Sequence, residues 1–378
     1  MAITKTRIPL PGLYPGVVHE LMVLQFGTAG SRSIYVQAGL HADEHPGLLV
    51  LQHLIEMLKE LDERNKIQGQ ITIVPFANPI GMSQRIFDNV LGRFDFSNGE
   101  NFNRNFPCFD ALITQQLGAG VKHSVSDWKS CFVSHLDSLS PSTPTGAMKR
   151  HLARLAIQHD IVLDLHCDIE CIPHIYASHT QADQAVRLSG ALSVPVVLLE
   201  PDGASGRAFD NIYSNAWRQL ELNGAIVSEQ RGFSATIELR GKADVNDYWA
   251  KVDATGLLEF MIQENIVDGS DMARRDAHTA ITQNYELATA SQIPCPVAGL
   301  VTYKKRPGDA VSEGEVIAEV VHLDSDCFGE RTAVHSDCDG LLVIRQVPGL
   351  VRPGQRLALI ASKTRLPSWD GNHSLLDA

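Results

Sequence analysis

Three residues with metal-binding side chains follow short apolar segments that are predicted to form strands. His41 and Glu44 come after residues 33–39, and His166 comes directly after residues 161–165. Because strand ends in an α/β fold meet at one edge of the sheet, we expect the three side chains to lie together. Two imidazoles and one carboxylate suit Zn²⁺ and leave a fourth position for water, which is the arrangement of a catalytic site.

The spacing of His41 and Glu44 is weak support on its own. His53 and Glu56 repeat it inside a segment of helical periodicity, where such a pair usually faces solvent. His41, however, follows a strand and a glycine, at the edge of the sheet where α/β proteins bind ligands. We therefore favour metal binding for His41 and Glu44 and solvent exposure for the second pair.

His166 also allows two interpretations. A lone histidine after an apolar strand is more often a hydrogen-bonded core residue than a ligand. The neighbouring acids Asp164 and Asp168 could orient an imidazole through hydrogen bonds, as the outer partners of metal ligands do. Beside His41 and Glu44, we predict His166 to be the third ligand.

Glu238 is a carboxylate within the apolar segment 235–239. Burying a glutamate costs free energy unless it is paired or acts as an acid or base. Glu238 either faces solvent at the edge of a sheet or is a general base. A base in a metal-dependent hydrolase takes a proton from the attacking water and passes it to the leaving nitrogen. We predict the second role.

Arg85 and Arg104 lie in the segment 84–107, where Gly, Asn and Phe dominate and no periodicity is visible. A long irregular segment in a compact domain is usually functional or disordered. Arginine has a planar fork that can hold a carboxylate or polarise a carbonyl oxygen, and Asn103 could add a donor. The plainer alternative is a pair of surface salt bridges.

Apolar strands alternate with amphipathic helices over the first two thirds of the chain. We predict strands at 33–39, 70–75, 161–165, 193–199 and 234–239, and helices at 46–61, 148–158, 181–192 and 252–265. This alternation indicates an α/β fold with a mainly parallel sheet that is covered by helices on both faces.

The pattern changes after about residue 290, where short strands with Gly/Pro turns replace helices. Residues 307–314 recur loosely as 348–355, and residues 299–301 match 340–342. Two similar β halves indicate a small all-β sandwich. We therefore predict a hydrolase domain at 1–288 and a β domain at 289–378.

The composition excludes several classes of protein. A chain of 378 residues with 44% apolar and 20% charged residues is typical of a globular protein with two domains. The net charge of −12 disfavours nucleic acid and anionic membranes as partners. The N-terminus lacks the apolar stretch of a signal peptide, and no run reaches the length of a membrane span. Seven cysteines without regular spacing argue against a disulfide framework, so we expect a cytoplasmic protein.

Together these residues resemble the succinylglutamate desuccinylase/aspartoacylase family, a branch of the zinc carboxypeptidase-like fold, over about residues 30 to 265. The matching motifs are Gly39-Leu40-His41-Ala42-Asp43-Glu44, Asp164-Leu165-His166, Thr236-Ile237-Glu238-Leu239, Asn103-Arg104, and Arg85 downstream of Asn78-Pro79.

The resemblance implies hydrolysis of an amide bond of a small N-acyl amino acid or related compound. It implies one Zn²⁺ per chain, held by the three ligands predicted above, with Glu238 as the base. Asn103 and Arg104 would then bind a substrate carboxylate, and Arg85 would stabilise the oxyanion. Relatives often have an acid two residues before the Asn-Arg pair, to support a ligand histidine. Here that residue is Asn101, an amide that raises imidazole basicity less.

The C-terminal domain resembles the barrel-sandwich modules of biotinyl and lipoyl domains. Those carriers present a modified lysine on the hairpin between their halves, whereas residues 321–328 contain no lysine. We therefore predict no attached biotin or lipoate. We expect the module to cover the active site, to shape the pocket or to mediate homo-oligomerisation.

Two alternatives remain open from the sequence. One is a carboxypeptidase that acts on small peptides. The other is a non-catalytic metal-binding or interaction protein in which the β module engages a partner. Similar donors also suit divalent metals other than zinc.

Overall fold

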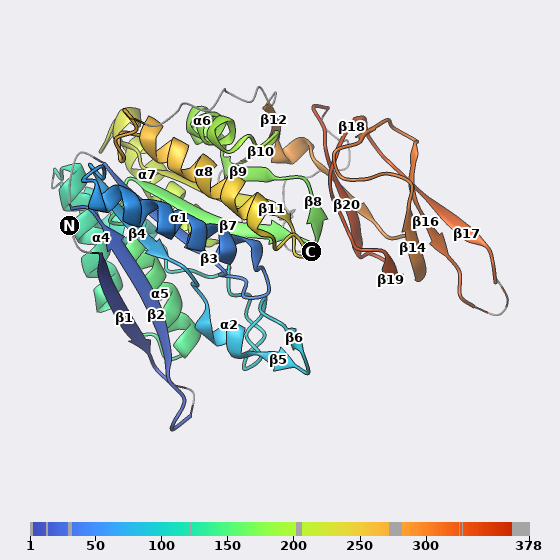
Figure 1. The fold of residues 1–378 in the computed structure, drawn as a ribbon, viewed down its shortest axis with the longest axis horizontal. Coiled ribbons are helices and arrows are strands. Elements are labelled where there is room, and N and C mark those ends of the chain that lie inside the picture. The colour runs from blue at the N-terminus through green and yellow to red at the C-terminus, as the bar shows by residue number, and fades with distance from the viewer. Residues whose placement is uncertain are drawn as a thin grey trace.

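The structure of the protein is a computed structural model that describes residues 3–12, 14–28, 32–120, 122–201, 206–271, 282–324, 326 and 328–364. A large mixed sheet with helices on both faces lies beside two smaller sheets, which are formed by the C-terminal strands (Figure 1). The predicted α/β fold with a small all-β C-terminal domain is confirmed.

The large sheet has nine strands in the order β1-β2-β4-β3-β7-β11-β9-β10-β12. The strands β4, β3, β7 and β11 are parallel to one another, so their carboxyl ends lie at one edge of the sheet. The strands β9, β10 and β12 run antiparallel to β11. The bounds are β1 (Thr4–Leu10), β2 (His19–Phe26), β3 (Ser33–Ala38), β4 (Gln70–Val74), β7 (Ile161–Asp168), β9 (His174–Ser178), β10 (Val196–Glu200), β11 (Phe233–Gly241) and β12 (Gln283–Glu286).

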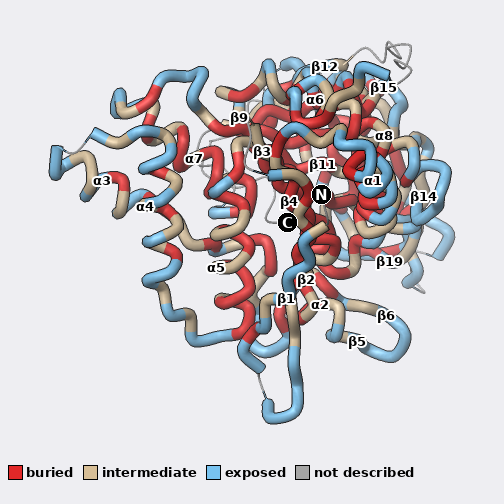
Figure 2. The backbone as a smooth tube through the Cα atoms, turned by 60° about the vertical axis from the view of Figure 1, so that its left-hand side comes forward, coloured by how far each residue is buried: buried red, intermediate tan, exposed pale blue. Residues whose placement is uncertain are grey.

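Helices bury both faces of this sheet. One apolar cluster joins the sheet to α1 (Pro46–Glu63), α6 (Ala182–Leu192) and α8 (Asp247–Gln263). A second cluster joins the other face to α3 (Asp110–Gly118), α4 (Val125–Ser138), α5 (Pro144–Ala156) and α7 (Phe209–Leu222). Figure 2 shows the central strands almost wholly buried, whereas the hairpin of β5 (Arg85–Ile86) and β6 (Asn89–Val90) is largely exposed.

Helix α1 shows why the predicted elements form where they do. Leu51, Leu54 and Leu58 recur at helical spacing and are fully buried against the sheet. Pro46 occupies the first turn, where its missing N–H has no intrahelical partner to lose. The helix therefore begins just after Glu44 and positions the loop that precedes it.

Several strands and helices of the structure are not predicted from the sequence. Strand β1 has almost no buried residue, because it forms the edge of the sheet, so it lacks an apolar pattern. Helix α7 buries Phe209, Ile212, Tyr213 and Trp217, a helical pattern that the sequence does contain. Strands β2, β9 and β12 and helices α3 and α4 were also not predicted.

The C-terminal strands form a two-layer sandwich. One sheet has the order β13-β20-β18-β15 and the other β17-β16-β14-β19. Their shared core includes Val301, Ile317, Leu342 and Ile360. The predicted boundary at 288/289 lies between β12, which pairs with the large sheet, and β13. The bounds are β13 (Ser291–Pro294), β14 (Gly299–Tyr303), β15 (Ala310–Val311), β16 (Val316–Val321), β17 (Arg331–His335), β18 (Gly340–Arg345), β19 (Gly349–Val351) and β20 (Arg356–Ala361).

The sandwich is joined to the large sheet by backbone pairing and by apolar packing. The short strand β8 (Glu170–Cys171), which follows β7, pairs antiparallel with β18. Tyr176 and Leu198 of the large sheet share an apolar cluster with Val343 and Leu359 of the sandwich. The C-terminal module is therefore docked beside the edge at which β7 ends (Figure 1).

The described residues can be compared with two expectations from the sequence, which concern disulfides and membrane spans. The cysteines that the structure describes, Cys108, Cys131, Cys167, Cys171, Cys295 and Cys338, are free thiols. No helix in the described ranges has the length and apolar character to cross a membrane.

A buried histidine links the sheet to α5. His159 is 3% exposed, its Nδ1 donates to the Leu155 carbonyl (2.9 Å), and its Nε2 accepts from the Thr72 hydroxyl (2.8 Å). These contacts satisfy both nitrogens of the neutral ring. Burial lowers the pKa of His159 from 6.5 to about 4.

We expect His159 to make the fold sensitive to acid. In the unfolded chain the ring takes up a proton as the pH falls through about 6.5, whereas the folded state resists until about pH 4. Stability is therefore present above the unfolded pKa and is lost as the pH falls through this window, by up to about 3 kcal/mol. Denaturant unfolding at several pH values should show a flatter pH dependence for His159→Gln than for the wild type. The exposed His335→Gln is the control, and equal slopes for all three proteins would contradict the assignment.

Candidate metal centre and active site

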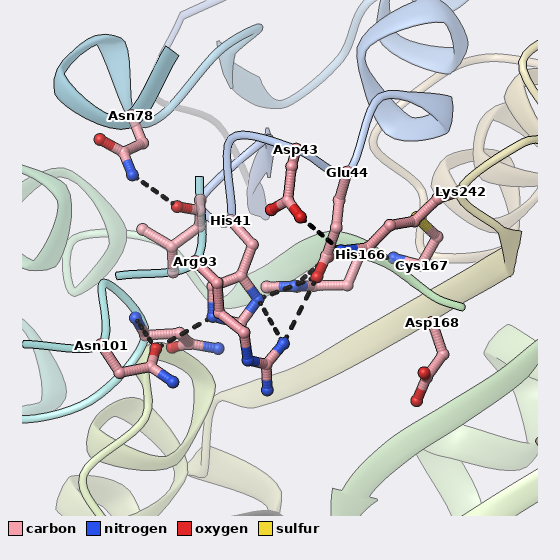
Figure 3. Close-up of polar contacts among 12 residues, drawn as sticks. His41, Asp43, Glu44, Asn78, Arg93, Asn101, His166, Cys167, Asp168 and Lys242 are labelled. Atoms are coloured by element: carbon pink, nitrogen blue, oxygen red, sulfur yellow. Dashed lines mark hydrogen bonds and ion pairs between the residues drawn. The ribbon is translucent and has the colours of Figure 1, made fainter. Parts of the chain in front are cut away.

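The loop between β3 and α1 places His41 and Glu44 at the carboxyl edge of the sheet. Gly39 adopts φ +70°, and a Cβ there would lie 2.9 Å from a methyl group of Leu48, so the turn requires glycine. Asn78 donates to the Leu40 carbonyl (2.9 Å) and anchors the loop (Figure 3). The strand therefore ends in a fixed turn directly before the two candidate ligands.

The structure brings the three predicted ligands together. Glu44 Oε1 lies 3.0 Å from His41 Nδ1, and Glu44 Oε2 lies 2.8 Å from His166 Nδ1. All three side chains are buried, and one donor atom from each lies within 4.8 Å of the others. Figure 3 shows these side chains converging from the β3–α1 loop and from β7.

Acceptors on the far side of each imidazole fix its orientation. His41 Nε2 donates to Asn101 Oδ1 (3.0 Å), and the same oxygen accepts from the Asn103 backbone N–H (2.8 Å). His166 Nε2 donates to Asp164 Oδ2 (2.9 Å). Because each Nε2 faces an oxygen acceptor, the Nδ1 atom of each ring is directed at Glu44 and is the atom available to a metal ion.

This arrangement needs a positive charge between the donors. A lone pair on Nδ1 and a carboxylate oxygen at 2.8–3.0 Å repel each other unless a proton or a metal ion lies between them. Burial lowers the pKa of His41, which favours its neutral form. Burial also lowers the pKa of His166, but Asp164 and Glu44 outweigh it and raise that pKa well above its usual value. The donor set therefore fits a divalent cation.

A buried chain of hydrogen bonds connects His166 to the core of the sheet. Asp164 Oδ1 accepts from Gln37 Nε2 (3.0 Å), and Gln37 Oε1 accepts from the Tyr35 hydroxyl (2.8 Å). Tyr35, Gln37 and Asp164 are all fully buried. The predicted orienting role of Asp164 thus has a structural basis, whereas Asp168 contacts a different residue, Arg356.

Glu238 lies beside His166, because the two residues are register partners on the parallel strands β11 and β7. It lines the same cavity as the candidate ligands. Its Oε2 is buried and has no hydrogen-bond partner within the described part of the chain. Burial raises the pKa of Glu238 to about 8, and the nearby Glu44 carboxylate adds to the increase. An unpartnered carboxylate beside a cation site is suited to proton transfer.

Asn103 and Arg104 also line the cavity, as the sequence predicts. Asn103 Oδ1 accepts from the Phe209 backbone N–H (2.9 Å) at the start of α7. Arg104 Nη1 donates to the Asn103 carbonyl (2.7 Å). These bonds hold the irregular segment against α7.

Arg85 does not reach the cavity, so its predicted place is wrong. It lies on the exposed strand β5, outside the set of residues that line the cavity. Arg93 is there instead, with Nη1 3.4 Å from His41 Nδ1 and 3.7 Å from Glu44 Oε1. The hairpin turns outward at Arg85 and returns at Gly92, whose carbonyl accepts from the Ala42 N–H (2.9 Å).

Gly92 is the signal that could have identified Arg93. A Cβ at this position would lie 2.4 Å from the Asp43 backbone nitrogen, so glycine is required for the close approach. A glycine next to an arginine in an irregular segment is too common to decide the matter by itself.

Other residues of the cavity come partly from distant elements and partly from positions next to the predicted residues. The cavity has a volume of about 240 Å³. Lys242, which follows β11, forms a close ion pair with Asp43. The further lining residues not predicted from the sequence are Arg93, Cys167, Ile169, Tyr176, Glu200, Ala208, Asp210, Thr236 and Arg356.

Comparison with known proteins gives a match to one family model over part of the chain, and a shared fold over most of it. Residues 31–123 match the model of the Succinylglutamate desuccinylase/Aspartoacylase catalytic domain. No curated protein matches the sequence. The segment that matches includes His41, Glu44, Asn103 and Arg104.

Solved structures share the fold over almost the whole chain. A succinylglutamate desuccinylase/aspartoacylase family protein from Shewanella amazonensis has 24% identity and a TM-score of 0.81, with 95% of this chain and 99% of that chain covered. One from Shewanella frigidimarina has 22% identity and a TM-score of 0.83, with 95% and 97% covered. The product-bound ectoine utilization protein EutE (DoeB) from Ruegeria pomeroyi has 17% identity and a TM-score of 0.69, with 95% and 94% covered. Residues 31–123 are thus similar to the catalytic domain of this family, and the chain as a whole shares the fold of these solved structures.

Proposed function

We propose that this protein is a zinc-dependent amidohydrolase that removes the acyl group from a small N-acylated amino acid or a related compound. The observation that supports it most is Glu238 Oε2, which has no hydrogen-bond partner among the described residues and lies beside the buried donors of His41, Glu44 and His166. The volume of about 240 Å³ suits a small substrate better than a folded polypeptide.

The three ligands would hold one Zn²⁺ through His41 Nδ1, His166 Nδ1 and the Glu44 carboxylate. When bound, the ion polarises the scissile carbonyl and lowers the pKa of water. Asn101 and Asp164 keep the two rings in the tautomer that ligation requires.

Glu238 moves the proton in this proposal. Its Oε2 takes a proton from the attacking water and delivers it to the leaving nitrogen, so the amine departs neutral. Burial raises the pKa of Glu238, and a cation beside it would lower that pKa again. The carboxylate can then act as base and as acid in turn.

Two arginines have separate roles. Arg93 lies against the donor cluster, where its guanidinium can stabilise the negative charge that develops on the carbonyl oxygen. Arg104, with Asn103, lines the cavity and can hold a substrate carboxylate through charge-assisted hydrogen bonds.

We expect purified protein to contain one zinc ion per chain, and the ligand variants to lose it. His166→Gln removes a ligand and should abolish binding, whereas Asp164→Asn keeps the ligands and should weaken affinity by roughly 10- to 100-fold. His53→Gln is the matched control, because His53 and Glu56 repeat the ligand spacing and His53 contacts Asp247 instead. Elemental analysis and competition with a chelator give the affinities. Equal zinc content in His53→Gln and His166→Gln would contradict the site.

We expect Glu238→Gln to retain zinc and to lose roughly 10²- to 10⁴-fold in kcat, because the amide cannot accept the proton. The assay is hydrolysis of a panel of N-acyl amino acids, with Glu56→Gln, on the exposed face of α1, as control. Full hydrolysis by zinc-loaded Glu238→Gln would remove Glu238 from the mechanism. Faster cleavage of short peptides than of N-acyl amino acids would favour a carboxypeptidase. Hydrolysis of neither would favour a non-catalytic role.

The two arginines of the hairpin segment allow a matched comparison. Arg93→Gln should lower kcat/KM by roughly 10²- to 10³-fold, because a donor to the developing oxyanion is lost. Arg85→Gln removes an exposed side chain from the same hairpin and should leave kcat/KM near the wild-type value. A larger loss in Arg85→Gln than in Arg93→Gln would return the role to Arg85.

A further inference from the structure

A second cavity lies at the edge of the large sheet opposite the candidate metal centre. The strands β3, β7 and β11 are parallel, so their first residues share the edge that is remote from His41 and His166. Arg32, Asp160 and Gly232, which directly precede these three strands, line a cavity of about 230 Å³. It shares no lining residue with the cavity of the metal centre, so the two cavities are separate.

Three cationic side chains from three parts of the fold line this second cavity. Arg32 precedes β3, Lys129 lies on α4, and Arg231 follows the short 3₁₀ helix η2 (Ser228–Gln230). The chain as a whole has a net charge of −12, so a group of three cations runs against its composition. Clustered cations in a concave site attract anions.

The two acids that line this cavity do not pair with its arginines. Asp160 Oδ1 accepts from Lys129 Nζ (2.5 Å), and Asp160 Oδ2 accepts from the backbone N–H and the hydroxyl of Ser33 (2.9 and 2.8 Å). Glu229 is exposed and forms no ion pair with any residue that the structure describes. Neither carboxylate therefore occupies the place of an acceptor for the arginines.

Both arginines are fixed by residues outside the lining, and each keeps one donor without an acceptor. Arg231 Nη1 donates to Glu221 Oε2 (2.6 Å), and its Nη2 donates to the Thr180 carbonyl (2.5 Å). Arg32 Nη2 pairs with Glu264 Oε2 (2.8 Å). The Nε atom of each arginine is buried and has no hydrogen-bond partner among the described residues. A buried N–H without an acceptor costs free energy, so the two guanidiniums lack an acceptor that a ligand could supply.

The surroundings of the two guanidiniums favour a charged ligand over water. The Arg231 side chain is only 10% exposed. Val125 and the buried Trp217 form an apolar part of the lining. Charge-assisted hydrogen bonds are stronger where water is excluded, because the local dielectric constant is lower. The ion pairs with Glu221 and Glu264 explain why the arginines are held in place, but they leave the two buried Nε atoms unexplained.

We propose that the second cavity binds a small oxyanion through the Nε–H groups of Arg32 and Arg231, with Lys129 adding to the positive charge. The ligand is a compact molecule that carries a phosphate or a carboxylate, because a guanidinium donates to both in the same planar geometry. The site does not depend on the proposed hydrolase activity. A bound anion connects the residues that precede β3 and β11, and it therefore stabilises the folded chain.

Calorimetry with the full chain, titrated separately with inorganic phosphate and with malonate, tests this proposal. Whichever anion binds more tightly identifies the chemistry of the ligand, and it should also raise the Tm of the wild type. Arg231→Gln and Arg32→Gln should each weaken its Kd by roughly 10- to 100-fold, because a charge-assisted hydrogen bond is lost. Glu229→Gln should tighten the Kd by roughly 2- to 5-fold, because it removes a negative charge from the lining.

Two controls separate this site from its surroundings. Arg187→Gln should keep the wild-type Kd, because Arg187 pairs with the same Glu264 (3.1 Å) but does not line the cavity. Arg104→Gln alters the cavity of the metal centre and should also keep it. A loss in Arg104→Gln in place of Arg231→Gln would put the anion in that other cavity and overturn the proposal.

Three further results would also overturn the second site. One is the absence of saturable binding of either anion up to about 10 mM, well above the Kd of a specific site. Another is an equal Kd in wild type, Arg32→Gln and Arg231→Gln. The third comes from Glu229→Gln, which changes only an exposed side chain and should fold even if the arginine variants do not. Binding that is weaker than or equal to the wild-type binding in this variant would contradict the proposal.

Discussion

The structure depends on one buried carboxylate held between two imidazoles. Glu44 faces both Nδ1 atoms at 3.0 and 2.8 Å, and all three side chains are buried. Because Asn101 and Asp164 occupy the Nε2 atoms, the rings cannot turn away from Glu44. Such a cluster is costly without a cation, since buried charge needs compensation. The surrounding fold therefore has to hold the two Nδ1 atoms and the Glu44 carboxylate close together although they repel each other. Only rigid elements around the cluster can do this.

The parallel part of the sheet supplies that rigidity. The strands β3, β7 and β11 end side by side, so residues far apart in the chain meet at the same edge. A series of hydrogen bonds connects Tyr35 and Gln37 of β3 with Asp164 of β7. Asp164 in turn accepts from His166, so the buried strands fix the orientation of the His166 ring. The C-terminal module closes the same edge, since β8 extends β7 outward to pair with β18. This module contributes Arg356 to the lining of the cavity.

The sequence predicts the residues that follow apolar strands and misses those whose position depends on tertiary contacts. His41, His166 and Glu238 could be identified because each stands at or after a run of buried residues whose periodicity is visible locally. Arg93 could not be told from Arg85, because the hairpin that exposes one and returns the other is fixed by the contact of Gly92 with Ala42. Arg356 meets Asp168 across 188 residues of chain, and no local pattern encodes that pairing. Tyr176 could not be identified for the same reason, because its sequence neighbours indicate only a buried strand and not a place at the cavity.

Asn101 shows how the candidate metal centre and the irregular segment that lines the cavity depend on each other. Its Oδ1 accepts from His41 and from the Asn103 backbone, while Asn103 in turn accepts from the start of α7. Lys149, which is buried, donates to the Asn101 carbonyl (3.1 Å) and pairs with Glu100 (2.6 Å), so the segment is fixed from behind. An aspartate at this position would make the imidazole more basic, but it would add another negative charge near Glu44, Asp164 and Glu238. The amide accepts both hydrogen bonds without that charge. The orientation of the candidate ligand His41 and the position of Asn103 at the cavity thus follow from a single oxygen atom.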